Sequence, residues 1–131
     1  MKERIEQELV LLRGRWADIE YLPEGQWFRI REYALPAGWN RTSTAVAFQP
    51  QVSHPGTPPY GIYVPAGLTF NGQRPDNYTE PAPAQPPFGG VWGIFSWTPS
   101  DGEWRPATDP RAGSNLLNWA LGFADRFREG K

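Results

Sequence analysis

Few side chains in this sequence are of the types that usually do chemistry. The chain has no cysteine, which excludes thiol nucleophiles, thioester carriers, iron–sulfur clusters and thiolate zinc sites. It has one histidine, His54, so a histidine metal sphere or a Ser–His–acid triad would have to use that residue. His54 stands beside Pro55 in a turn-like stretch, and we expect its role to be structural. Carboxylates are scattered without a compelling pair, which leaves glycosidase chemistry only a weak alternative.

The composition narrows the possible ligands further. The sequence has neither G-x-G-x-x-G nor G-x-x-x-x-G-K-[ST], so we expect no phosphate-cradling loop, no cofactor and no metal. Thirteen basic against fourteen acidic residues give a net charge of −1 without a sustained basic run, which argues against nucleic acid. The N-terminal apolar run is too short for a signal peptide, and no 18-residue apolar stretch occurs. We therefore expect a cytoplasmic protein that does not enter a membrane.

The elements that must position any site are an N-terminal helix and a set of short strands. Ile5, Leu9, Leu12 and Trp16 recur at helical spacing, which predicts a helix from about Glu3 to Arg13 with Gly14 just after it and the charged residues, Glu8 included, mostly around the other side. Short runs rich in aromatic and β-branched residues then alternate with Pro/Gly turns. These runs predict four strands, at Ile19–Tyr21, Trp27–Tyr33, Thr44–Gln49 and Ile62–Val64.

The second half of the chain predicts a long loop and a final helix. Residues 65–90 are rich in proline and glycine, so we expect an irregular surface excursion, and the apolar run 91–97 after it should be buried. Apolar residues recur at helical spacing from Ser114, a suitable N-cap, to Arg128. Residues 1–131 thus predict a single α+β domain: N-terminal helix, four-stranded antiparallel meander, long Pro/Gly-rich loop and C-terminal helix.

Several motifs, in order and spacing, resemble those of the ubiquitin-conjugating (E2/UBC) enzymes. His-Pro-Gly-Thr-Pro-Pro at 54–59 resembles the family's Tyr-Pro-x-x-Pro-Pro element. Twelve residues past Pro59 stands Asn71, where the family's His-Pro-Asn triplet has its asparagine, and eight residues further, at the offset of the catalytic cysteine, stands Thr79. Trp97-Thr98-Pro99 resembles the family's Trp-Ser-Pro. The likeness is closest to the bacterial branch known as prokaryotic E2 family E, through Leu35–Arg41, Tyr63–Leu68 and Trp104–Pro106.

The resemblance implies a site that this chain could not use in the family's way. Without cysteine no thioester forms, so the chain would be either an inactive binding module or a carrier that uses a hydroxyl oxyester. Thr79 is one candidate hydroxyl, with Asp76 or Glu80 as the nearby bases, and Ser96 is another, in a stretch we expect to be buried. Asn71 could stabilise an oxyanion, or Asn71-Gly72 is simply a turn dipeptide.

The same resemblance implies partners. One is an E1-like activating protein, contacted by the first helix through the basic residues Lys2, Arg4, Arg13 and Arg15. The other is a ubiquitin-like β-grasp modifier. The modifier's C-terminal tail would lie along Asn71 to Gly90 against Tyr78 and Phe88. Two other classes stay open: an RWD-type interaction domain unrelated to such modifiers, and a hydrolase or sugar-binding protein with a pocket of Trp and carboxylates. We expect Trp92, Trp97 and Trp104 to be core rather than pocket residues.

Overall fold

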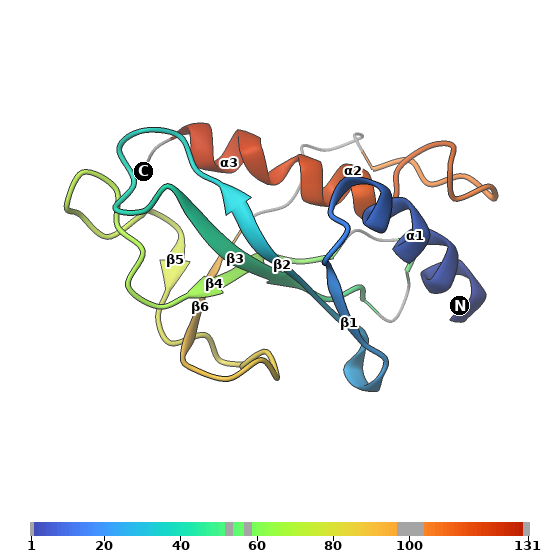
Figure 1. Ribbon diagram of the computed structural model, residues 1–131, viewed down its shortest axis with the longest axis horizontal. Coiled ribbons are helices and arrows are strands. Elements are labelled where there is room, and N and C mark those ends of the chain that lie inside the picture. Colours follow the sequence, from blue (N-terminus) through green and yellow to red (C-terminus); the bar gives the residue numbers. More distant parts are fainter. Residues whose placement is uncertain (1, 52–53, 57–58, 97–103, 130–131) are drawn as a thin grey trace.

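The computed structural model describes residues 2–51, 54–56, 59–96 and 104–129. Three helices lie along one side of a single β-sheet, with α1 at one end and α2 and α3 following each other along the rest (Figure 1). In chain order the elements are α1 (Lys2–Arg15), β1 (Glu20–Leu22), the 3₁₀ turn η1 (Glu24–Gln26), β2 (Trp27–Ala34), β3 (Ser43–Phe48), β4 (Ile62–Pro65), β5 (Tyr78–Thr79), β6 (Trp92–Phe95), α2 (Leu116–Leu121) and α3 (Phe123–Glu129).

The sheet is antiparallel and has the order β1-β2-β3-β4-β6-β5. Its first four strands are neighbours in chain order, as the sequence predicts for a meander. The predicted count of four is wrong, because β6 adds to β4 and the two-residue β5 closes the far edge. The segment expected to be an irregular loop therefore contributes a strand, and the buried apolar run after it contributes another.

Two helix boundaries also differ from the sequence predictions. The helix α1 continues through Gly14 to Arg15, so Gly14 does not end it. The C-terminal segment is two helices that meet at Gly122, and the N-cap is Asn115 rather than Ser114. The Asn115 side chain accepts a hydrogen bond from the backbone N–H of Asn118 at 2.8 Å, which satisfies a donor of the first turn.

The main core fills the space between the helices and one face of the sheet. Its largest fully buried side chains are aromatic and come from both layers: Phe28, Phe48, Phe95, Trp119, Phe123 and Phe127. The C-terminal stripe that the sequence predicts is buried as expected, since Leu116, Ala120, Phe123 and Phe127 are all inaccessible. Burial of this aromatic surface is the main stabilising contribution to the fold.

A smaller cluster covers part of the opposite face of the sheet. Trp27, Ala47 and Trp92 form it, and Phe88 packs against it from the loop before β6. That loop is tied to the sheet by Gln85, whose amide donates to the carbonyl of Trp92 at 2.9 Å and whose Oε1 accepts from the Trp92 N–H at 2.8 Å. The side chain of Gln85 thus takes the place of a neighbouring strand beside β6.

Candidate functional site

The two candidate hydroxyls lie on the β5–β6 hairpin and share one face of it. Tyr78 pairs with Phe95 and Thr79 with Ile94, while the N–H of Ser96 donates to the carbonyl of Asn77 at 2.8 Å. Side chains alternate along a strand, so Thr79 and Ser96 project to the face opposite the Tyr78–Phe95 pair. Both residues are exposed, and the expected burial of Ser96 is therefore wrong.

Glu80 cannot assist Thr79, because its carboxylate is held on the other face. Its Oε2 accepts hydrogen bonds from the Tyr78 hydroxyl at 2.9 Å and from the backbone N–H of Gly67 at 3.1 Å. Burial of the phenol, together with the adjacent Glu80 carboxylate, raises the pKa of Tyr78 far above its usual value. Tyr78 is thus a neutral donor to Glu80, and of the two expected bases for Thr79 this one is engaged elsewhere.

Gly93 allows Tyr78 to lie flat across β6. A Cβ at position 93 would come within 2.1 Å of the Tyr78 hydroxyl oxygen, far inside contact distance. The Tyr78 ring also packs on Phe95 with a centroid separation of 4.8 Å. Sequence reasoning gave Gly93 no role, and the only local signal was a glycine inside an otherwise bulky apolar run.

Asn71 occupies the tip of a tight turn. Phe70 and Gln73 exchange backbone hydrogen bonds of 2.9 Å in both directions, and Asn71 and Gly72 between them have φ values of +50° and +80°. Two consecutive left-handed residues define a type I′ turn, for which Asn-Gly is the preferred dipeptide. The turn alternative accounts for the conformation of Asn71, which is exposed at the tip of the turn.

The two aromatic residues expected to hold a modifier tail lie on opposite faces of the sheet. Tyr78 packs against the main core between sheet and helices. Phe88 belongs to the smaller cluster on the other face, where the Arg29 guanidinium lies 4.8 Å from its ring centroid. The structure therefore does not bring Tyr78 and Phe88 together, and a single extended tail cannot pack on both as the resemblance implies.

The basic residues of α1 have different surroundings. Arg4 turns inward: its Nε donates to Glu8 at 2.8 Å and its guanidinium also donates to the carbonyl of Ala107 at 2.5 Å. The expectation that Arg4 serves a partner is therefore corrected, because its charge is committed inside the protein. Arg13 is exposed, and Lys2 begins the helix.

Glu8 is the residue that sequence reasoning missed. It was assigned to the solvent side of the first helix, yet it is fully buried. Its Oε2 contacts His54 Nε2 at 2.6 Å, and its Oε1 accepts from the N–H of Leu116 at 2.6 Å, at the start of α2. The spacing of Glu8 from Ile5 and Leu12 places it on the buried stripe, which is the signal that could have found it.

Charge and hydrogen bonding decide the state of Glu8. Burial alone would raise the pKa of this carboxyl, but hydrogen bonds from His54, Arg4 and the Leu116 N–H outweigh it and hold the pKa below 4.5. The expected structural role of His54 agrees with its burial, and Trp104 fixes the same turn by donating from Nε1 to the carbonyl of Pro55 at 2.8 Å. This cluster joins α1, the turn at 54–56 and α2.

The remaining expectations concern tryptophans, metals and membranes. Trp92 is buried as expected and Trp104 is half-buried against the main core, while the Trp-Thr-Pro element at 97–99 lies outside the described residues. Within the part of the chain that the structure describes, no three histidine, cysteine or acidic side chains gather as a metal site. Among those same residues, no helix has the length and apolarity needed to cross a bilayer.

Comparison with known proteins assigns no family. No family model, no curated protein and no solved structure matches this chain.

Proposed function

We propose that the protein is a non-catalytic binding module of the ubiquitin-conjugating type, which contacts an E1-like activating protein and a β-grasp modifier in a bacterial ubiquitin-like conjugation pathway. The proposal starts from the ordered motifs between residues 35 and 106. The helix–meander order of α1 to β4 and the covering of one sheet face by helices are compatible with it.

The surroundings of Thr79 support the non-catalytic part of the proposed function. It stands at the offset of the family's catalytic cysteine, so it is where an acyl group would be held. A hydroxyl needs a base to become a nucleophile, and the neighbouring Glu80 is bonded to Tyr78 and Gly67 on the other face of the hairpin. Thr79 is therefore an exposed hydroxyl whose sequence neighbour Glu80 is not available as a base, which supports a non-catalytic role.

The surface for the activating protein is the exposed side of α1. Arg13 supplies charge there, and Val10, 68% exposed, supplies an apolar contact that the sequence analysis did not single out. An exposed aliphatic residue flanked by charge is a suitable contact for a partner protein, with the charge acting mainly on the association rate.

The test uses the full chain with an E1-like protein and a modifier from the same genome. With ATP present, we expect co-purification with the E1-like protein but no covalent adduct on a denaturing gel, with or without hydroxylamine. Val10→Asp and Arg13→Glu should weaken binding about tenfold, whereas Arg41→Glu, an equally exposed charge reversal outside α1, should not.

Two results would overturn the proposal. A hydroxylamine-sensitive adduct that disappears in Thr79→Ala or Ser96→Ala would show oxyester chemistry, because the two exposed hydroxyls share one face of the hairpin. Absence of binding to both partners would instead leave an RWD-type interaction domain with no link to such modifiers.

A further inference from the structure

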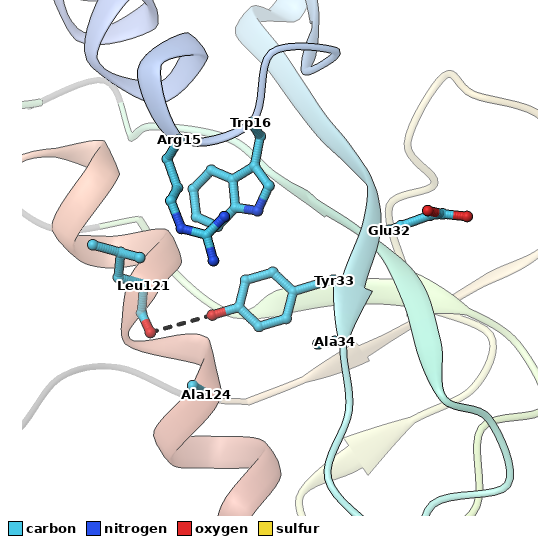
Figure 2. A pocket seen from close by; sticks show the side chains of 7 residues that line it. All are labelled: Arg15, Trp16, Glu32, Tyr33, Ala34, Leu121 and Ala124. Atoms are coloured by element: carbon cyan, nitrogen blue, oxygen red, sulfur yellow. Dashed lines mark hydrogen bonds between the residues drawn. The ribbon is translucent and has the colours of Figure 1, made fainter.

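A cavity of about 400 Å³ opens between the end of α1, the end of β2 and the junction of α2 with α3. Figure 2 shows the Trp16 and Tyr33 rings on one side and Leu121 with Ala124 on the other. Leu121 is 41% exposed although Trp119 and Ala120 before it are buried, so the cavity offers apolar surface to solvent. Its volume lies within the usual range of ligand pockets.

One cation faces this apolar surface. Arg15 directs its guanidinium between the Trp16 ring and Leu121, with its central carbon 4.9 Å from the Trp16 ring centroid (Figure 2). Stacking on an aromatic ring leaves the edge of a guanidinium free for a bidentate partner. No carboxylate of the described residues lies within salt-bridge distance of Arg15. Glu32, which also lines the cavity, projects away from Arg15 on the far side of β2 (Figure 2).

Two further polar groups near the cavity are already hydrogen-bonded or paired within the protein. The Tyr33 hydroxyl donates to the carbonyls of Ala120 at 2.7 Å and Leu121 at 3.2 Å. Asp125, on the same helical segment, is paired with Arg128. The charged group that faces the apolar surface between Trp16 and Leu121 is therefore Arg15, which favours an anion attached to an apolar group.

The sheet edge beside the cavity identifies the form of that ligand. β1 pairs with β2 only as far as the Glu20–Arg29 pair, so β2 continues from Ile30 to Ala34 beyond the end of β1. The pairing of β2 with β3 shifts register between Ile30 and Tyr33 and is regular again at Tyr33 and Ala34. The backbone at this regular end can accept hydrogen bonds from an added chain. Tyr33 and Ala34 at its end line the cavity, so an extended chain lying along the edge would reach Arg15 with its last residue.

We propose that this cavity binds the C-terminal residue of an extended polypeptide, with an apolar last side chain between Trp16 and Leu121 and its carboxylate on Arg15. The cavity lies beside β2, whereas Thr79 lies on β5 at the other edge of the sheet, so the site is separate from the implied path of a modifier tail. The family resemblance placed Arg15 on the helix surface that contacts an E1-like protein, whereas its guanidinium faces this cavity.

The test is an NMR titration of the ¹⁵N-labelled full chain with the capped tetrapeptide acetyl-Thr-Val-Thr-Phe bearing a free C-terminus. We expect saturable shifts at the Trp16 indole N–H, at Arg15 Nε–H and at Leu121. The matched probe is the same peptide as a C-terminal amide, which should bind about tenfold more weakly because it lacks the charge-assisted hydrogen bonds.

Two variants and a small carboxylic acid serve as controls for the titration. Arg15→Gln should weaken the acid peptide about tenfold and leave the amide peptide unchanged, while Arg41→Gln should change neither. If 3-phenylpropionate binds as well as the acid peptide, the occupant is a free acid and the chain-end proposal fails. The proposal also fails if the acid peptide gives no saturable shift at 10 mM, or if acid and amide bind equally. None of these arms contains an E1-like protein or a modifier, so their outcome is independent of the proposed function.

Discussion

Replacing Glu8 with glutamine isolates the buried carboxylate that connects the first and last parts of the chain. The side chain keeps its shape, but the negative charge that His54 and Arg4 contact is removed. One amide oxygen can still accept from the Leu116 N–H, whereas the amide nitrogen then faces the donors that used to bond to Oε2. The variant therefore leaves buried donors without an acceptor.

The loss of stability in Glu8→Gln can be estimated from the buried donors that are left without an acceptor. Removing one partner from a buried ionic cluster costs about 3 to 5 kcal/mol, and the retained Leu116 contact places Glu8→Gln near the lower figure, about 3 kcal/mol. Domains of this size have a free energy of unfolding of about 5 to 15 kcal/mol, so the variant should stay folded at room temperature. Its melting temperature should fall by about 10 °C.

The stability difference between wild type and Glu8→Gln should depend on pH, and the direction of the dependence follows from the pKa of Glu8. The pKa of Glu8 is lowered in the folded state, so its contribution is complete above pH 4.5 and is lost as the pH falls through the lowered pKa. The stability gap between wild type and Glu8→Gln should therefore be largest at pH 7 and should narrow below pH 4.5. Other acidic groups are common to both proteins and cancel in the difference.

The assay is urea unfolding followed by tryptophan fluorescence at pH values from 7 to 3. Glu6→Gln is the matched control, since Glu6 is exposed on the same helix and its removal should change the stability by about 0.5 kcal/mol or less. The reasoning is refuted if the two variants are equally stable at pH 7, or if the gap for Glu8→Gln does not change with pH.

Three further substitutions test other contacts by the same unfolding assay. Tyr33→Phe should lower the free energy of unfolding by about 1 kcal/mol, because the hydroxyl no longer donates to the carbonyl of Ala120. Burial raises the pKa of Tyr33 to about 12, so the wild-type protein should show a phenol that titrates near pH 12 by absorbance. Gly93→Ala should cost about 2 kcal/mol or more by displacing the Tyr78 hydroxyl, and Tyr78→Ala in the same chain should return part of that loss. Asn71→Ala should cost about 1 kcal/mol because φ is +50°, whereas Asn71→Gly should be nearly neutral; equal effects would count against the type I′ turn.

The parts of the fold that local sequence encodes were predictable. β2 and β3 lie within one residue of the runs of aromatic and β-branched residues that predict them. By contrast, β5 has two residues in a Pro-rich stretch, and only its pairing with β6 makes it a strand. The first helix was predicted, but its end was placed too early, because Gly14 lies in open space where the helix simply continues.

The candidate site was harder to predict because its contacts are distant in sequence. Two of the partners of Glu8, His54 and Leu116, lie 46 and 108 residues away. Apart from its place on the apolar stripe, nothing in the neighbouring sequence predicts that this glutamate is buried. Sequence patterns singled out Thr79 by its offset from Asn71 and Ser96 as a second hydroxyl, but they did not predict that both lie on one hairpin. They did not show that Glu80 points to the other face, since that depends on strand pairing and on its bond to Tyr78.

The bond from Leu116 to Glu8 has a consequence for how the protein is made. During synthesis on the ribosome, Glu8 emerges 108 residues before the backbone group that completes its shell. Until Leu116 is available, the Glu8 carboxylate lacks one of the hydrogen bonds that compensate for its burial, so α1 cannot take its final position on the sheet. We therefore expect the domain to fold only once α2 has left the exit tunnel, as one late cooperative event.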